Sequence, residues 1–126
     1  QRQMCIRDRN TEPEEYQKSL ARQYIDAGAD AVIGAHPHVL QGIEYYQGKP
    51  IFYSLGNFIF ANRTYETMMA ELTVTDEGIE VRVIPCVSTA NQMGLMDGSG
   101  RAAFYGNLQG LCFGGVTIGE DGSVRE

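Results

Sequence analysis

The sequence predicts a mixed α/β (α+β) fold, and three observations support this prediction. A helical pattern with its own start and stop signals is followed directly by a short, apolar, β-branched run. Further along the chain, aromatic and β-branched runs are paired around short turn sequences, which is typical of β-hairpins. The composition of the 126 residues, 43% hydrophobic and 21% charged, is that of an ordinary globular domain with a hydrophobic core.

The first predicted element is a helix over about residues 12 to 27. Thr11 and Glu14 have the spacing of an N-terminal capping box, and Gly28 supplies the signal for the C-terminal end. The apolar face is predicted from side chains that repeat about every four positions, namely Tyr16, Leu20 and Tyr24 with Ala21 and Ile25 beside them.

Short strands are expected after this helix. The run AVIG, residues 31 to 34, has the pattern of a buried strand in an α/β unit. Two hairpins are predicted next, one around QGK with Gly48 in its turn and one around TDEG, between MMAELTV and IEVRVI. The second run of that later hairpin alternates Ile and Val with Glu and Arg, so one face of the sheet is expected to be exposed to water.

The C-terminal third is predicted with less regular structure. Residues 85 to 100 are rich in Ser, Thr, Asn and Gly and are interpreted as a loop of about 15 residues. A short helix is expected over about residues 102 to 111, and GGVTIGEDGSV is typical of a strand followed by the opening of a hairpin.

Residues 34 to 42, GAHPHVLQG, contain both histidines of the chain. A residue before proline is restricted to extended backbone, so we expect Pro37 to hold His36 in β or polyproline geometry at the strand end. Side chains two residues apart in an extended segment project to the same side. His36 and His38 are therefore predicted to face one cavity, while Pro37 points away.

Such a histidine pair suits either one metal ion held by both rings or two neighbouring ions that take one ring each. Two histidines do not complete a site, because catalytic zinc-type centres have at least three protein ligands. The alternative interpretation, that both side chains only make hydrogen bonds, stays open because short motifs often match by chance. The position at the carboxyl end of a strand, where α/β sheets bind ligands, favours function.

Other polar residues are weaker candidates. Asn57, in SLGNF, could reach a metal or a phosphate, although an asparagine after glycine is commonly a turn residue. Glu44 is interpreted as a solvated strand residue, and Asp26 and Asp30 as turn and cap residues. The tyrosines are assigned to sheet packing, namely Tyr45, Tyr46 and Tyr53.

Several classes of protein are disfavoured by charge and composition. The formal net charge of −6, without a cluster of Lys and Arg, argues against a nucleic-acid partner. No apolar run reaches the roughly 18 residues that a membrane span requires. The three cysteines, at positions 5, 86 and 112, form no CxxC pair, so neither a zinc knuckle nor a disulfide framework is indicated.

The opening QRQMCIRDRN has neither periodicity nor turn chemistry. We interpret residues 1 to 10 as a non-native segment and residues 11 to 126 as the C-terminal part of a larger fold. A fragment of this kind is expected to expose apolar strand edges and to associate.

Residues 24 to 60 resemble the CapA family, the bacterial capsule synthesis or poly-γ-glutamate synthesis proteins related to calcineurin-like metallophosphoesterases. Three linked motifs match in order, DAGAD, GAHPHV and GKPIFYSLGNF, and EPEEYQKSLA before them also fits, so the similarity covers about residues 12 to 84. The resemblance implies the C-terminal half of a four-layer α-β-β-α sandwich with a two-metal site at the sheet edges. His36 and His38 match its metal-binding element, in which Ala35 replaces a glycine, and Asn57 is expected near the site.

The resemblance also implies a function. The parent protein is expected to be a metal-dependent phosphoesterase-type hydrolase with two divalent ions, acting on an anionic polymer or phosphoester in capsule or poly-γ-glutamate synthesis or export. Other capsule synthesis proteins are expected partners, at the extracytoplasmic face of the bacterial cell envelope. The remaining metal ligands would lie in an N-terminal half, so the two metal ions are expected only when that half is present, and this chain alone is expected to be inactive. The alternative is a non-catalytic structural or polymer-handling subunit with the same fold.

Overall fold

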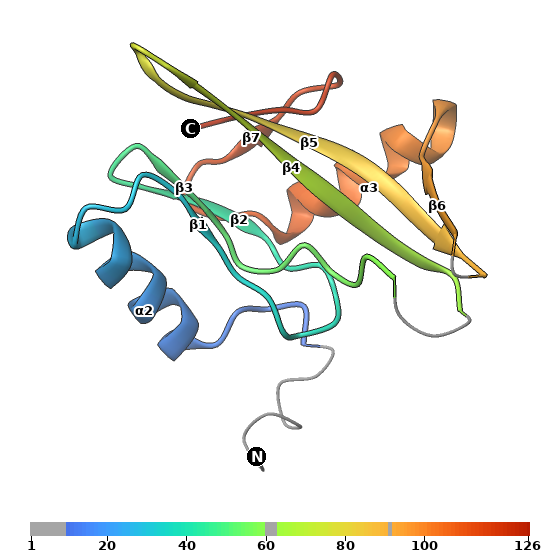
Figure 1. Ribbon diagram of the computed structural model, residues 1–126, viewed down its shortest axis with the longest axis horizontal. Coiled ribbons are helices and arrows are strands. Elements are labelled where there is room, and N and C mark those ends of the chain that lie inside the picture. Colours follow the sequence, from blue (N-terminus) through green and yellow to red (C-terminus); the bar gives the residue numbers. More distant parts are fainter. Residues whose placement is uncertain (1–9, 60–62, 91) are drawn as a thin grey trace.

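The computed structural model describes residues 10–59, 63–90 and 92–126, which form two β-sheets and two helices (Figure 1). The predicted mixed α+β sandwich is confirmed. The segment interpreted as non-native lies, apart from its last residue, outside the described residues. In chain order the elements are α2 (Glu15–Asp26), β1 (Val32–Ile33), β2 (Ile43–Tyr46), β3 (Lys49–Phe52), β4 (Tyr65–Thr75), β5 (Gly78–Thr89), β6 (Gln92–Leu95), α3 (Gly98–Leu111), β7 (Thr117–Ile118) and β8 (Ser123–Arg125).

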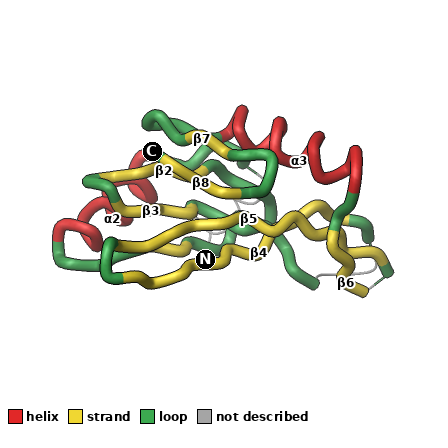
Figure 2. Tube along the Cα trace, turned by 90° about the horizontal axis from the view of Figure 1, so that it is seen from above, coloured by secondary structure: helices red, strands yellow, loops and turns green. Residues whose placement is uncertain are grey.

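The two sheets differ in size and in strand direction. In the three-stranded sheet the order is β1-β3-β2, with β1 parallel to β3 and β2 antiparallel to it. In the five-stranded sheet the order is β4-β5-β8-β7, and β6 pairs with β5 beyond the reach of β8. The long β4–β5 hairpin lies across the smaller sheet, as the two views show (Figures 1 and 2).

Both hairpins predicted from turn sequences are confirmed. The β2–β3 turn places Gln47 and Gly48 at φ values of 54° and 72°, which is the left-handed geometry of a tight hairpin turn. The β4–β5 hairpin pairs in continuous register from Tyr65 opposite Ser88 to Thr75 opposite Gly78. Its β5 strand buries valines at alternate positions and exposes the charged residues between them, so the predicted wet face is also confirmed.

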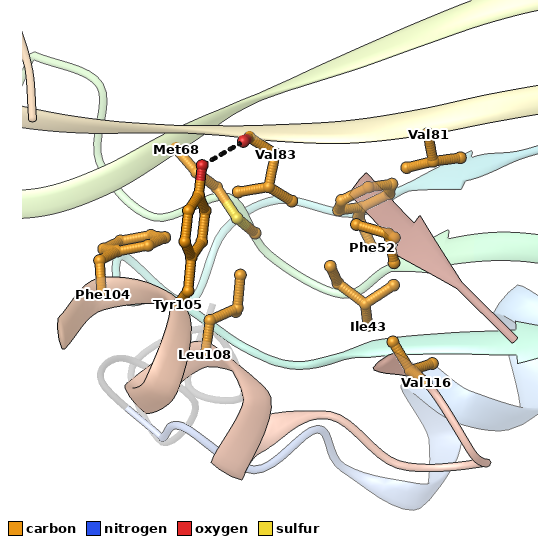
Figure 3. Close-up of a cluster of buried hydrophobic side chains, with 10 residues drawn as sticks. Ile43, Phe52, Met68, Val81, Val83, Phe104, Tyr105, Leu108 and Val116 are labelled. Carbon is orange, nitrogen blue, oxygen red and sulfur yellow. Dashed lines mark hydrogen bonds between the residues drawn. The ribbon is translucent and has the colours of Figure 1, made fainter. Parts of the chain in front are cut away.

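Strand β3 separates two hydrophobic clusters because its side chains alternate between the faces of the small sheet. Ile51 and Tyr53 face helix α2 together with its Ala21 and Ile25. Phe52 faces the other way, into the main core between the sheets, which α3 also lines (Figure 3). The main core is made of Ile43, Phe52, Met68, Val81, Val83, Phe104, Tyr105, Leu108, Val116 and Val124.

Helix α2 begins later than the predicted residue 12, and the capping box predicted at Thr11 and Glu14 is wrong. The N–H of Glu14 instead donates to the side-chain oxygen of Gln17 at 2.9 Å. Because Pro13 disfavours helical backbone at the residue before it, the helix starts only after the proline. Its predicted end is confirmed: Gly28 has φ 105°, its N–H donates to Ile25 O, and the N–H of Ala29 donates to Tyr24 O.

The predicted apolar face of α2 is only partly buried. Ala21 and Ile25 are 6% and 4% exposed. The larger side chains lie mostly outside the contact with the sheet. The exposed fractions of Tyr16, Leu20 and Tyr24 are 43%, 44% and 51%. The helix packs through a narrow strip of smaller residues, which leaves an apolar stripe on its flank.

Strand β1 is also less buried than predicted. It comprises two residues at the edge of its sheet, and Ile33 is 51% exposed. The AVIG run is apolar throughout, which is why a buried strand was predicted. In the structure, however, β1 pairs with a strand of the described chain along one edge only.

The prediction that Glu44 is a solvated strand residue is wrong. Glu44 is 4% exposed, and its carboxylate accepts hydrogen bonds from Arg22 Nη2 and from the hydroxyl of Tyr53, each at 2.6 Å. The side chain lies on the face of β2 that α2 covers, and sequence periodicity does not reveal which helix crosses a strand.

The predicted loop over residues 85 to 100 is wrong as well. Strand β5 continues to Thr89, β6 follows, and α3 starts at Gly98 rather than at residue 102. The polar side chains that suggested a loop lie in a strand ladder; Ser88, for example, is fully buried and pairs with Met93. The C-terminal hairpin is confirmed, with β7 antiparallel to β8. Neither helix in the described part of the chain is long and apolar enough to cross a membrane.

Candidate functional site

The candidate site lies where two neighbouring parallel strands end. The N–H of Gly34, just after β1, donates to Phe52 O at the end of β3 with a length of 2.7 Å. The loop with the two histidines follows β1, and the loop with Asn57 follows β3. Carboxyl ends of adjacent parallel strands share one sheet edge, which is the usual ligand-binding edge of α/β sheets.

His38 and Asn57 are joined by two hydrogen bonds. Asn57 Oδ1 lies 2.8 Å from His38 Nδ1, and Asn57 Nδ2 donates to the backbone carbonyl of His38 at 3.0 Å. One amide therefore contacts both the ring and the main chain of the same residue. The contact fixes the ring orientation and supports His38 in its left-handed backbone conformation, φ 61°.

His36 lies beside His38, with 5.9 Å between the ring centroids and an interplanar angle of 52°. The extended backbone predicted for His36 is wrong, because this residue has φ 101°. Pro37 is fully buried. The local preference of His36 for extended backbone is outweighed by two tertiary contacts. Pro37 is packed in the interior, and Leu40 pairs with Leu55 after the chain has turned back. Left-handed non-glycine residues are strained, and they cluster at functional sites.

The loop after β3 is held in place by short-range contacts. Gly56 has φ 81°, which turns the chain so that Asn57 reaches His38. The hydroxyl of Thr67, on β4, donates to Leu55 O at 2.7 Å, and Leu55 forms a bridge with Leu40 in the histidine loop. Sequence reasoning missed Thr67 as a support of this loop, because no local pattern links it to a loop twelve residues earlier.

The other acidic candidates lie elsewhere. Asp26 accepts a hydrogen bond from the side chain of Gln47 at 2.8 Å, and Asp30 pairs with Lys49. Both therefore contact the β2–β3 turn and its flank, at the opposite end of the hairpin from Asn57. Among residues 10–59, 63–90 and 92–126, no group of three or more His, Cys, Asp or Glu side chains is placed to hold a metal ion.

Two cysteines in the described chain also lie outside the candidate site. Burial raises the pKa of the Cys86 and Cys112 thiols, and thiolates are the form that binds metals. Cys112 Sγ accepts a 3.4 Å hydrogen bond from the N–H of Ile43, which is a structural role.

The hydrogen bond on the His38 ring is of the kind found at metal-binding histidines. Metal-binding histidines usually have the second ring nitrogen hydrogen-bonded to a neighbouring oxygen, which fixes the tautomer and the ring. Asn57 Oδ1 is positioned to accept from Nδ1–H of His38, and this tautomer presents the lone pair on Nε2. The donor set of two imidazoles suits zinc and similar first-row transition metals.

Comparison with known proteins places the same loops in a matched region. Residues 6–62, which include both histidines and Asn57, match the family described as bacterial capsule synthesis protein PGA_cap. The chain is 57% identical over 51 residues to the PGA biosynthesis protein CapA of Bacillus subtilis, which covers 40% of this chain and 13% of that protein. It is 40% identical over 75 residues to the capsule biosynthesis protein CapA of Bacillus anthracis, and this match covers 57% of this chain and 18% of that protein.

A similar match is found to the uncharacterized protein y4sH of Sinorhizobium fredii, which is 59% identical over 49 residues, covering 39% of this chain and 11% of that protein. The chain thus spans less than a fifth of the length of these curated relatives.

Proposed function

We propose, from the premise that this chain belongs to the CapA family of bacterial capsule synthesis proteins, that it carries part of the metal site of a phosphoesterase-type hydrolase. In this proposal His36 and His38 bind divalent metal, and Asn57 is a positioning residue for His38. The whole protein acts in synthesis or export of capsule or poly-γ-glutamate at the cell envelope.

The observation that carries the proposal is the double contact between Asn57 and His38, beside the ring of His36. A histidine that only filled space would not need one amide to hold both its ring and its carbonyl. Two loop histidines with positive φ also require compensating contacts, which the surrounding loops provide.

Each residue has a defined role in this proposal. His38 presents Nε2 from a fixed ring, and His36 supplies a second imidazole from the same loop. A bound divalent ion would polarise a phosphoryl oxygen and lower the pKa of a coordinated water. The chain has a net charge of −6, so an anionic polymer or phosphoester requires such a local cation to bind here.

Weak metal binding by this chain, which supplies only two of the expected ligands, tests the assignment of these two histidines. Histidine imidazole resonances should shift when Zn²⁺ or Co²⁺ is added, and His36→Ala or His38→Ala should each weaken binding at least about tenfold because two-point binding is lost. Asn107→Ala is the matched control, since Asn107 is exposed on α3 away from the loops. Equal metal affinity in the histidine variants and the control would refute the assignment.

Hydrolysis is tested on a longer relative. The CapA protein of Bacillus subtilis, with the residues that align with His36 and His38 replaced by alanine, should lose metal-dependent cleavage of a phosphodiester such as bis(p-nitrophenyl) phosphate. If the unsubstituted protein binds metal through these positions but cleaves no phosphoester, the non-catalytic polymer-handling subunit becomes the better assignment.

A further inference from the structure

The carbonyl group of Leu55 accepts two hydrogen bonds from strand β4. The hydroxyl of Thr67 donates to it at 2.7 Å, and the N–H of Met68 donates to it at 3.3 Å. Leu55 lies two positions before Asn57 in the loop that follows β3, whereas β4 belongs to the larger sheet. The larger sheet therefore contacts this loop close to the residue that holds His38.

The part of β4 that carries both donors is firmly packed. Thr67 and Met68 are each 1% exposed. The side chain of Met68 points into the main core (Figure 3). Because side chains alternate along a strand, Thr67 is directed away from that core, and it pairs with the fully buried Cys86 of β5. This part of β4 is thus a rigid support for the loop.

The Thr67 hydroxyl also lies against the turn that directs Asn57. Gly56 has φ 81° in this turn, and a methyl group added to Gly56 would lie 3.4 Å from Thr67 Oγ1. The N–H of Gly56 donates to Ser54 Oγ at 3.2 Å. Since the turn is confined in this way, a change in the direction of the Leu55 carbonyl would displace Asn57 with it.

The hydroxyl of Thr67 is not needed to satisfy the Leu55 carbonyl. The N–H of Met68 already pairs with that oxygen, although a carbonyl oxygen has two lone pairs and can accept a second bond. Packing in a strand does not require a hydroxyl either, because the β-branched valine is equally favoured there. A second donor on the same oxygen therefore restrains the rotation of this peptide group.

We propose that Thr67 is a positioning residue of the candidate site and acts through Asn57 on the ring of His38. Thr67 fixes the direction of the Leu55 carbonyl, and the amide of Asn57 then meets both the ring and the carbonyl of His38. The larger sheet thereby sets the orientation of a histidine that the smaller sheet carries. The effect on the ring is independent of metal, whereas the effect on metal affinity rests on the proposed function.

Valine and serine at position 67 separate the hydroxyl from the shape of the side chain. Thr67→Val in the metal-free chain should shift His38 from a single tautomer toward a mixture, as read from imidazole nitrogen chemical shifts. Zn²⁺ affinity should fall about 3–10-fold, which is less than the effect of removing a group that contacts the histidine directly. Thr67→Ser keeps the donor and should restore both quantities. Thr73→Val is the matched control and should change neither, because Thr73 is exposed on the same strand.

Two further measurements test the route from Thr67 to the ring. In an Asn57→Ala background, Thr67→Val should add no further change to the tautomer ratio or to Zn²⁺ affinity. Coupling between two contacts is reciprocal, so Asn57→Ala alone should weaken the contact of the loop with β4. Hydrogen exchange of the Met68 amide, which donates to Leu55 O, should then speed up at least about fivefold relative to the Val83 amide, which donates to the carbonyl of Gly122.

Four outcomes would overturn this role of Thr67. These are a folded Thr67→Val with an unchanged His38 tautomer, failure of serine to restore the tautomer, an equal effect of Thr73→Val, or simple addition of the effects of Thr67→Val and Asn57→Ala. If Thr67→Val does not fold, the Met68 amide decides, and an unchanged exchange rate in Asn57→Ala would overturn the role. A tautomer effect without Zn²⁺ binding would support the role of Thr67 and refute the metal-site assignment alone.

Discussion

Arg22 and Glu44 join helix α2 to the β2–β3 hairpin by an ion pair in which Arg22 Nη2 lies 2.6 Å from Glu44 Oε1, with a second hydrogen bond from Nε at 3.1 Å. The Glu44 side chain is 5% exposed and that of Arg22 is 41% exposed. The hydrogen bond to Glu44 raises the pKa of Arg22, as expected for a cation beside a carboxylate. The contact holds the helix against the strand next to β3.

Replacement of Glu44 by alanine should lower the free energy of unfolding by about 2–3 kcal/mol. Loss of one partner of a buried pair costs about 3–5 kcal/mol, but Arg22 is partly solvated, which moderates the effect. Urea denaturation monitored by circular dichroism would measure it. Glu71→Ala is the control, because its pair with Arg82 is 3.8 Å long and both side chains are more than half exposed, so a change below about 0.5 kcal/mol is expected. Equal losses in the two variants would contradict the role of Glu44.

The same carboxylate makes the fold sensitive to alkaline pH through Tyr53. Burial, and then the hydrogen bond to Glu44, raise the pKa of the Tyr53 hydroxyl. Above the unfolded tyrosine pKa of about 10, the unfolded chain loses a proton that the folded chain keeps, so stability falls as pH rises. The slope contributed by this one group approaches about 1.4 kcal/mol for each pH unit.

The pH effect is measured by urea denaturation between about pH 8 and pH 11, on either side of the unfolded tyrosine pKa, for the unsubstituted chain and for Tyr53→Phe. The variant should be about 1 kcal/mol less stable at the lower pH, because a hydrogen bond is lost, and should show a shallower decline at the higher pH. Burial also raises the pKa values of Tyr45 and Tyr105, so some decline persists. Parallel curves for the two proteins would show that Tyr53 does not titrate as proposed.

Two glycines should respond oppositely to substitution by alanine. A methyl group on Gly42 would overlap the carbonyl oxygen of Leu111, which is backbone and cannot move aside easily, so Gly42→Ala should destabilise by about 3 kcal/mol. Gly106 lies in α3, and a methyl group added there would meet nothing within 4 Å, so Gly106→Ala should stabilise by about 0.5–1 kcal/mol. Thermal unfolding of both variants tests this, and destabilisation of similar size in both would contradict it.

Sequence features that act over a few residues predicted the structure well. The stop at Gly28 and the turn at Gln47 and Gly48 depend on local backbone geometry, which adjacent residues determine. Features that depend on which elements meet were not predictable from periodicity. The burial of Glu44 and the exposure of Leu20 are both decided by where α2 crosses the small sheet.

In the candidate site, too, local features were predicted better than contacts between distant residues. Its strand-end location and the pairing of the two histidines were predicted, but the predicted extended backbone of His36 was not found. The contact between His38 and Asn57 joins residues nineteen positions apart, and sequence alone indicated only that Asn57 was near the site. The parallel pairing of β1 and β3 brings their following loops together, and this pairing has no local signature.

Asn57 should determine the tautomer and the metal affinity of His38. In Asn57→Ala the ring loses its acceptor at Nδ1, so we expect the single tautomer with a proton on Nδ1 to become a mixture of both forms. Imidazole nitrogen chemical shifts, which differ between the two tautomers, would report this change without metal. Zn²⁺ affinity should fall by about 10–100-fold, the usual effect of removing a group that orients a metal-binding histidine.

Asn57→Asp separates the two contacts of this side chain. An aspartate keeps an oxygen for His38 Nδ1 but cannot donate to the His38 carbonyl, so the tautomer should be retained while the free energy of unfolding falls by about 1 kcal/mol. Asn107→Ala on α3 should change neither quantity, because Asn107 is exposed and lies outside the loops. A His38 ring that keeps its tautomer and its Zn²⁺ affinity in Asn57→Ala would mean that Asn57 stabilises the loop without positioning the histidine, and the two contacts would then be structural only.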